Sequence, residues 1–208
     1  MEILQAFKRK YEQDYRSIKI EVQDTNDGTV RSPFDSAQAH FWNEVGWRKM
    51  CLLRTRCMQR PGDHDFVFFL DSDTVLLPPT LAHLVNIEGT DMLTEIHWTS
   101  WEAGAPPLPN VWSGGQYRFA PGFLEGLRKT TVAPVGGMGG VVLIPRRVLA
   151  AGVTYQAVPN LDYQGEDRHF CVRAAAMGFR LHADTYYPAL HLYRQSILDE
   201  YLRRRAPS

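Results

Sequence analysis

The sequence predicts an α/β sandwich in which helices cover a largely parallel central sheet. Short apolar runs alternate with helical patterns along the chain, as they do in proteins built from β-α-β units. The chain has 208 residues, of which 44% are hydrophobic, and this is enough for a substantial core. No internal repeat, low-complexity segment or domain boundary interrupts the pattern. We therefore expect residues 1–208 to form a single domain.

The first quarter of the chain predicts two helices with a short strand between them. Apolar side chains at helical spacing indicate a helix over residues 2–16, and the alternation in residues 18–22 indicates a strand. Residues 23–28 are rich in Asp, Asn and Gly, which is typical of a turn. A long helix is expected from about Ser36 to Met58. Its basic side chains could reach phosphates, but a solvent-facing helix surface explains them more simply; they are Arg48, Lys49, Arg54 and Arg56.

The middle of the chain begins with the strongest strand signal. The unbroken apolar run from Phe66 to Leu70 predicts a strand buried on both faces, as in a parallel sheet. Two prolines then open a helix that continues to about residue 85. Residues 91–98 indicate the next strand. The stretch 99–121 holds many Gly and Pro residues, and loops of this length in compact domains are usually functional or disordered.

The last third of the chain alternates strand and helix again. A strand is expected at 141–144, where Pro145 ends it, after a run with four glycines in five residues at 136–140. A helix begins near Glu166. Its apolar residues Phe170, Ala174 and Met177 lie at positions i, i+4 and i+7, which is a helical spacing. The remaining elements are a strand at 179–183 and a C-terminal helix from about Gln195.

Composition and charge exclude several classes of protein. Lys plus Arg and Asp plus Glu number 23 each, and this zero formal net charge argues against a generic binder of nucleic acid or anionic membranes. No run approaches the roughly 18 apolar residues of a membrane span, and the N-terminus lacks a signal-peptide pattern. Unpaired core thiols in a reducing compartment best explain the three cysteines, Cys51, Cys57 and Cys171. The sequence therefore predicts a soluble cytoplasmic protein with no integral membrane segment.

Two carboxylates follow the strand at 66–70 directly. In open α/β sheets, ligands bind beyond the carboxyl ends of the strands, and residues two apart in an extended chain point to the same side. Asp71 and Asp73 therefore form a candidate site for Mg²⁺ or Mn²⁺, which suits a substrate that carries phosphates. The alternative is a polar turn that closes the strand, because Asp and Ser are common turn residues.

Two further features could carry chemistry, and each also has a simpler explanation. Asp167 lies in the first turn of a predicted helix, where the macrodipole and free backbone N–H groups keep a carboxylate ionised, so it is a candidate general base. Helix capping alone also enriches Asp at this position. The glycines at 136–140 would let a ligand approach the backbone closely, or would simply make a tight turn into the next strand.

Three more side chains gain a role only if the fold places them suitably. His191 could complete a Mn²⁺ shell if the fold brings it to Asp73. Trp98 and Trp112 flank or occupy the long loop, where an exposed indole could stack on the apolar face of a sugar. Ordinary core packing is the alternative, and we expect it more for Trp98 than for Trp112.

Taken in order, these motifs resemble the GT-A glycosyltransferases, and especially the inverting family-2 type. The resemblance covers residues 18–193 and implies a three-layer α/β/α sandwich with a Rossmann-like, mostly parallel sheet. Four elements match in sequence order: Asp71-Ser72-Asp73 after a strand, the glycine run at 136–140, Gly165-Glu166-Asp167 at a helix start, and the C-terminal His191.

The resemblance also implies a role for each matching residue. Asp73 would be the principal metal ligand and His191 the C-terminal one, with Mn²⁺ or Mg²⁺ as cofactor. Asp71 would contact the ribose, or the metal through water, and Asp167 would be the catalytic base. The remaining implied roles are nucleotide recognition by Asp24, Asp71 and Ser72, and a donor and acceptor pocket lined by Gly139, Gly140, Glu166, Trp98 and Trp112.

These roles imply transfer from a UDP- or GDP-sugar to a hydroxyl of a glycan, lipid or small molecule. The metal would neutralise charge on the departing diphosphate while Asp167 activates the hydroxyl from the opposite face, and this single displacement inverts the anomeric centre. The family's fold normally opens with an apolar strand and a nucleotide-binding loop, whereas this chain begins with the helix that should follow them. We therefore expect part of the nucleotide-base pocket to be missing.

Two rival interpretations stay open. The run from Asp71 to Val75 also resembles the start of haloacid dehalogenase-like phosphatases, in which the first Asp is a covalent nucleophile. That family needs a downstream Lys and a second acidic pair, but after residue 75 the one lysine is Lys129 and no such pair follows. The other rival is a GT-A-like module that binds a sugar or nucleotide without turnover, and the absent first strand favours it.

Overall fold

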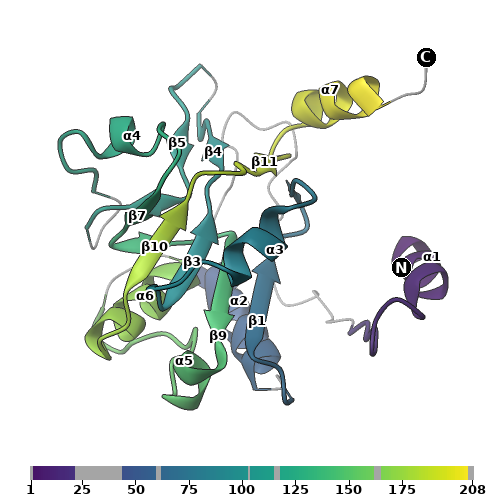
Figure 1. Ribbon diagram of the computed structural model, residues 1–208, viewed down its shortest axis with the longest axis horizontal. Coiled ribbons are helices and arrows are strands. Elements are labelled where there is room, and N and C mark those ends of the chain that lie inside the picture. The colour runs from purple at the N-terminus through teal and green to yellow at the C-terminus, as the bar shows by residue number, and fades with distance from the viewer. Residues whose placement is uncertain are drawn as a thin grey trace.

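The computed structural model describes residues 2–21, 44–59, 62–102, 104–114, 118–161 and 165–205 (Figure 1). Its helices are α1 (Glu2–Tyr11), α2 (Glu44–Met58), α3 (Thr80–Val85), α4 (Phe123–Gly126), α5 (Arg146–Ala150), α6 (Glu166–Ala176) and α7 (Gln195–Arg205). Its strands are β1 (Phe66–Leu70), β2 (Thr74–Val75), β3 (Met92–Glu95), β4 (Trp98–Thr99), β5 (Leu108–Pro109), β6 (Val111–Trp112), β7 (Val132–Pro134), β8 (Gly137–Met138), β9 (Val141–Pro145), β10 (Leu181–Asp184) and β11 (Leu190–His191).

The central sheet has five strands in the order β1-β9-β3-β10-β7, and it is mostly antiparallel. The one parallel pair is β3 with β10, whereas β9 runs against both of its neighbours and β7 runs against β10. The prediction of a largely parallel sheet is therefore wrong, although the mixed α/β class is correct. The alternation of strands and helices in the sequence shows where strands occur. It does not show whether a strand such as β9, which lies between β1 and β3, runs parallel or antiparallel to its neighbours.

Three strands nevertheless share one direction. Since β1 and β3 both run against β9, and β10 is parallel to β3, the carboxyl ends of β1, β3 and β10 lie at the same edge of the sheet. This is the upper edge in Figure 1, where the arrowheads of these strands point. The start of β9 lies at the same edge because β9 runs the opposite way. The segments that follow β1 and β3 are thereby brought next to the glycine run before β9.

The strand β1 lies at the outside of the sheet and pairs with β9 alone among the described strands. Its first and last residues, Phe66 and Leu70, are 40% and 46% exposed. The prediction that this strand is buried on both faces is therefore wrong. All five residues of β9 and all four of β3 are buried instead. An apolar run reports the hydrophobicity of a strand, but the same run fits either the middle or the edge of a sheet.

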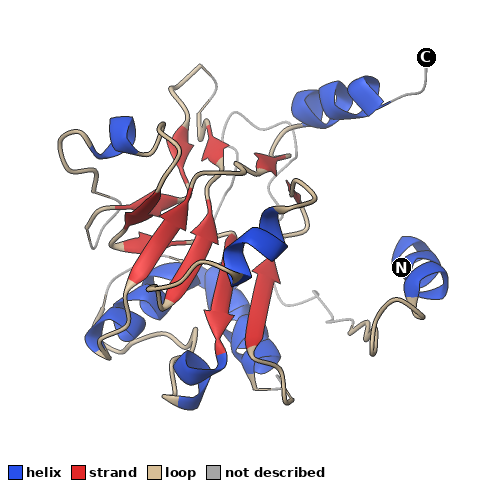
Figure 2. Cartoon of the chain, in the orientation of Figure 1, coloured by secondary structure: helices blue, strands red, loops and turns tan. Residues whose placement is uncertain are grey.

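Helices cover both faces of the sheet, and each side has its own core (Figure 2). The larger core joins α2, α5 and α6 to the sheet and includes Met58, Phe170 and Ile144. The smaller core on the other face joins α3 to Leu93 and Leu143. Successive strand residues point to opposite faces, so Leu143 and Ile144 of β9 enter different cores. The buried hydrophobic residues of β9 thus hold the two helical layers together.

Several local predictions differ from the structure. The helix at the start ends at Tyr11 rather than at residue 16, and residues 18–21 form no strand. The strand expected at 91–98 is divided into β3 and β4. The loop at 99–121 contains two two-residue strands, β5, which pairs with β4, and β6, which pairs with β8. The turn at 23–28 and the start of the helix expected from Ser36 lie outside the described residues.

The strand at Phe66–Leu70, the helix α3, and the starts of β9, α6 and α7 lie where the sequence predicts them. Cys51 and Cys171 are buried free thiols, as expected, whereas the free thiol of Cys57 is exposed. Among the helices that the structure describes, none combines the length and apolar character needed to cross a membrane.

Candidate functional site

Asp73 and His191 meet at the upper edge of the sheet, although they lie 118 residues apart in sequence. The short strands β2 and β11 pair antiparallel, and the backbone N–H of Leu192 donates to the carbonyl of Asp73 at 2.7 Å. This pairing places Nε2 of His191 at 3.3 Å from Oδ2 of Asp73. The other ring nitrogen, Nδ1, lies 2.7 Å from the hydroxyl of Thr99. Both nitrogens of the imidazole are thus oriented by named partners, and Nε2 faces the carboxylate.

Asp71 does not join this pair directly. The backbone N–H of Thr74 donates to the carbonyl of Asp71 at 3.1 Å, so residues 71–74 form a turn rather than extended chain. The premise of an extended chain at Asp71–Asp73 is therefore wrong, although Asp73 and His191 are both among the charges that act on the Asp71 carboxyl. The side chain of Asp71 accepts a hydrogen bond at 2.7 Å from Nη2 of Arg54 instead. Ser72 is exposed in this turn, and Asp24 lies outside the described residues.

The structure thus brings together one carboxylate and one imidazole as potential metal ligands. Over the described ranges, no group of three or more His, Cys, Asp or Glu side chains is arranged to hold a metal ion. Divalent cations such as Mg²⁺ are often held by one or two protein ligands and by phosphate oxygens of the substrate. Asp73 and His191 would suit Mn²⁺ on this pattern, since Mn²⁺ accepts both oxygen and imidazole ligands.

Asp167 lies behind the glycine run, at the start of α6. A Cβ added to Gly139 would clash with Oδ2 of Asp167, so the carboxylate occupies the space that the missing side chain leaves. Its other oxygen, Oδ1, is buried and has no hydrogen-bond partner in the part of the chain that the structure describes. Burial raises the pKa of Asp167 well above its ordinary value, and the neighbouring Glu166 raises it further. Burial and Glu166 therefore oppose the ionised form that the helix start was expected to favour.

The glycine run makes room for protein side chains as well as a turn. Gly140 adopts a φ of +79°, which favours glycine, and a Cβ there would lie 2.6 Å from Nε2 of His97. At Gly137 the indole of Trp112 fills the corresponding space. Side chains of the protein itself, from Trp112, Asp167 and His97, therefore fill the space beside Gly137, Gly139 and Gly140.

The two tryptophans differ from the sugar-stacking expectation. Trp112 is 3% exposed and belongs to the larger core, so the expectation that it is the less buried of the pair is wrong. Trp98 packs against the same core and is partly exposed, but the guanidinium of Arg128 covers its ring at 4.4 Å from the centroid. A Gly- and Pro-rich loop gives no sequence signal that distinguishes a buried indole from an exposed one.

Asn110, which the sequence did not single out, and Arg54 organise this edge of the sheet. Asn110 donates from Nδ2 to the carbonyl of Gly139 at 2.8 Å and accepts at Oδ1 from the N–H of His97 at 2.9 Å. It thereby fixes the long loop to the glycine turn. Arg54 was assigned to a solvent-facing helix surface, but it is 5% exposed and contacts Asp71 and Glu166. A single Asn or a basic helical residue carries no local signal for such long-range contacts.

A second carboxyl pair lies at the ends of β3 and β10. Glu95 and Asp184 are Cα partners on the parallel strands, and both are 0% exposed. Burial raises the pKa of Glu95 to about 9, and the Asp184 carboxylate adds to the shift. Nε2 of His83 lies 3.2 Å from Oδ1 of Asp184. Two adjacent buried carboxyls cannot both ionise cheaply, so the pair retains one proton at neutral pH.

Glu95→Gln should remove a fall in stability between about pH 5 and pH 9. Folded Glu95 keeps its proton up to about pH 9, while the unfolded residue releases it near its ordinary pKa of 4.5. The stabilisation from this proton is therefore complete below the unfolded pKa and is lost as pH rises through the folded one. We expect the free energy of unfolding of the unaltered chain to fall by more than about 1 kcal/mol between about pH 5 and pH 9.

Urea denaturation across this pH range measures the effect. Glu95→Gln should flatten the curve because the amide stays neutral, and Glu88→Gln, at an exposed position, should leave it unchanged. Parallel curves for the unaltered chain and Glu95→Gln would show that Glu95 is ionised in the folded state.

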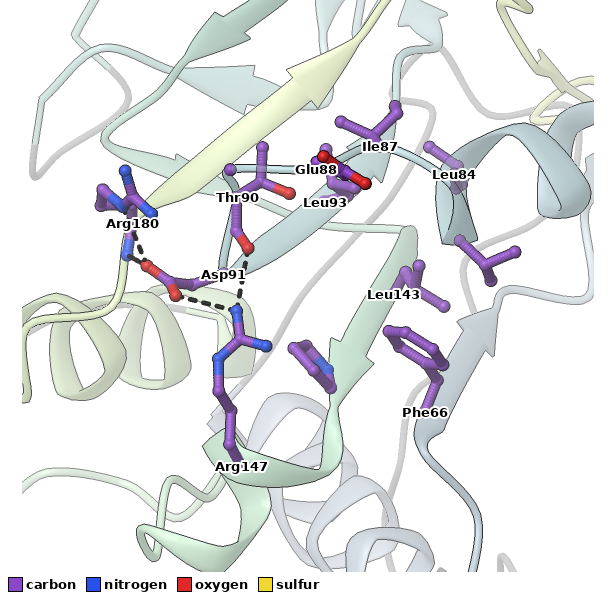
Figure 3. A pocket seen from close by; sticks show the side chains of 13 residues that line it. Phe66, Leu84, Ile87, Glu88, Thr90, Asp91, Leu93, Leu143, Arg147 and Arg180 are labelled. Carbon is purple, nitrogen blue, oxygen red and sulfur yellow. Dashed lines mark hydrogen bonds and ion pairs between the residues drawn. The ribbon is translucent and has the colours of Figure 1, made fainter.

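A cavity of about 460 Å³ lies at the opposite edge of the sheet (Figure 3). Apolar side chains such as Phe66, Leu84 and Leu143 line one part of it. At the other end, Asp91 contacts Arg147 at 2.9 Å and Arg180 at 3.1 Å, as the dashed lines show. These contacts hold the pKa of Asp91 down, at about 2, although burial opposes the shift. The cavity contains none of the residues that the sequence assigned to chemistry.

Comparisons with known proteins give distant structural likeness only. No protein-family model matches the sequence, and no curated protein matches it. Among solved structures, A197 from STIV is similar with a TM-score of 0.46 and 20% identity, over 68% of this chain and 66% of A197. GalNAc-T7, solved with UDP, GalNAc and Mn²⁺, is similar with a TM-score of 0.47 and 18% identity, over 74% of this chain and 32% of its own. Likeness at this level assigns neither a family nor an activity.

Proposed function

We propose that this chain is a metal-dependent glycosyltransferase that moves a sugar from a nucleoside-diphosphate donor to an acceptor hydroxyl with inversion. The observation that carries the proposal is the meeting of two halves of a site at one edge of the sheet. The Asp73–His191 pair supplies one half, and Asp167 behind Gly139 supplies the other. Arg54 lies between them, in contact with Asp71 and Glu166.

On this proposal Asp73 and His191 hold the donor diphosphate through a divalent cation, with Mn²⁺ preferred over Mg²⁺ because one ligand is an imidazole. When bound, the cation neutralises charge on the departing nucleoside diphosphate. Asp71, held by Arg54, presents its remaining carboxylate oxygen to the donor. Its side chain is 39% exposed, so it can reach a ligand without rearrangement of the sheet.

Asp167 is the general base of the proposed reaction. Its raised pKa gives the carboxylate the proton affinity that a base acting on a hydroxyl needs. The buried, unpartnered Oδ1 is the atom that would accept the proton. Arg54 is among the groups that stabilise the ionised form of Asp167, because its charge opposes the effect of burial.

The test is release of UDP or GDP from a panel of UDP- and GDP-sugars with Mn²⁺, repeated with a chelator. We expect release from one nucleotide class, loss of release with the chelator, and recovery when Mn²⁺ is added back. A chain that binds a nucleotide in the presence of Mn²⁺ but releases none from any donor would instead be a binding module without turnover.

Gly139→Ala should disable the proposed base without removing it. The added methyl group clashes with Oδ2 of Asp167, and a displacement of about 1 Å at a catalytic group can lower turnover about 10²-fold. The free energy of unfolding should fall by about 1–3 kcal/mol, as for other overpacked positions. Nucleotide release and urea denaturation measure the two effects.

The matched control is Gly126→Ala, where a Cβ would meet open space. Gly126→Ala should leave turnover unchanged, and it should change the free energy of unfolding by no more than about 1 kcal/mol. Full activity in Gly139→Ala would show that the position of the Asp167 carboxylate does not matter for turnover.

A further inference from the structure

Arg54 is a buried charge with two carboxylate contacts on separate elements. Its Nη2 lies 2.7 Å from Oδ1 of Asp71, which follows β1, and its Nε lies 3.2 Å from Oε1 of Glu166, at the start of α6. Only 5% of the residue is exposed. The guanidinium, which comes from α2, therefore joins the ends of two other elements through a hydrogen bond to Asp71 and an ion pair with Glu166.

Aromatic rings restrict the guanidinium further. It lies 5.6 Å from the ring centroid of Phe69 and 5.4 Å from that of Tyr155. The ring of Tyr155 is stacked on Phe170 of α6, with centroids 4.1 Å apart and planes 7° from parallel. A lysine ammonium would keep the charge here, but it could neither reproduce the fork nor stack in the same plane.

The cluster around Arg54 also contains polar atoms that need a further partner. Nε of Arg54, Oδ1 of Asp167 and the hydroxyl of Tyr155 are buried without a hydrogen-bond partner among the described residues, although Nε lies within ion-pair distance of Glu166. Buried polar groups in native proteins are almost always paired, by protein, water or ligand. A cluster that served folding alone would be more stable with apolar side chains of similar size than with one arginine among three carboxyls. The unpaired atoms therefore leave the cluster without a full set of partners among the described residues.

We propose that Arg54 is a positioning residue that fixes Asp71 and the start of α6, with Asp167, in the one relative geometry that transfer needs. This inference rests on the proposed glycosyltransferase function for its catalytic consequence. Its structural part does not: Arg54 ties the segment after β1 to the start of α6 whatever the chain does. The two parts are therefore tested by different measurements.

Hydrogen exchange tests the structural part on the full chain. In Arg54→Met, amides of the peptides spanning 66–75 and 165–177 should exchange at least about 5-fold faster than in the unaltered chain. The control Arg48→Met changes an arginine of the same helix whose side chain is 57% exposed, and it should leave both peptides unchanged. Unchanged exchange in Arg54→Met overturns the proposal, whether or not the chain releases nucleotide.

Kinetics of Mn²⁺-dependent nucleotide release test the catalytic part. Arg54→Lys keeps the charge and loses the fork, so we expect kcat to fall about 10²-fold while KM for the sugar nucleotide changes less than about 3-fold. Full kcat in Arg54→Lys would show that charge alone suffices, and a raised KM with unchanged kcat would show a role in donor binding; either result overturns the proposal. Absence of release from the unaltered chain counts against the glycosyltransferase function alone, because the exchange measurement still decides whether Arg54 joins the two segments.

Discussion

Asp167→Asn is expected to abolish Mn²⁺-dependent nucleotide release while it leaves Mn²⁺-dependent nucleotide binding unchanged. The substitution removes the proposed base and spares the Asp73–His191 pair, which lies just before β2 and on β11 rather than on α6. Loss of a general base lowers turnover by about 10²–10⁴-fold. The fold should tolerate the change, since burial raises the pKa of Asp167 and a neutral amide suits its surroundings.

Release and binding are measured on the same preparations, by product quantification and by titration calorimetry with UDP or GDP. Asp199→Asn, at an exposed position on α7, is the matched control and should match the unaltered chain in both. Unchanged turnover in Asp167→Asn would show that another group takes the proton from the acceptor.

Asp73→Ala should remove metal-dependent nucleotide binding. Asp73 provides the carboxylate that faces Nε2 of His191 at 3.3 Å, and alanine leaves the imidazole as a single ligand. The hydrogen bond from Leu192 to the backbone of Asp73 does not depend on the side chain, so β2 and β11 should still pair. We expect the affinity for Mn²⁺ with UDP or GDP to fall at least about 10-fold.

The control for this change is Asp63→Ala, because Asp63 is 90% exposed and contacts Arg146 at the molecular surface. Its affinity for Mn²⁺ with nucleotide should equal that of the unaltered chain. If Asp73→Ala bound Mn²⁺ and the nucleotide as tightly as the unaltered chain does, the cation would have to lie elsewhere.

The sequence predicted single elements well and their mutual arrangement poorly. Local hydrophobic patterning placed β1, β9 and α6, because each signal lies within about ten neighbouring residues. The direction of β9 and the edge position of β1 depend on pairing between residues far apart in the chain. Local patterns carry no information on such pairing, so the sequence predicts a largely parallel sheet and a strand at 66–70 that is buried on both faces.

The residues of the candidate site were likewise predicted only in part. The approach of His191 to Asp73 matches the order of motifs, which reports on the whole chain rather than on one segment. The burial of Arg54 does not follow from its helix, where basic residues at 48, 49, 54 and 56 look alike. The sequence predicts an ionised Asp167 on helix-dipole grounds, but burial of the side chain behind Gly139 opposes that effect and raises its pKa.

The most direct test of the proposed activity is one assay of UDP and GDP release from sugar nucleotides, run on the unaltered chain and on Asp167→Asn with and without Mn²⁺. Glycosyl transfer at this site predicts release by the unaltered chain with Mn²⁺ alone, and no release by Asp167→Asn under either condition. Free phosphate from a simple phosphomonoester, with a covalent label on Asp71 and no nucleotide release, would contradict the account and identify a phosphatase.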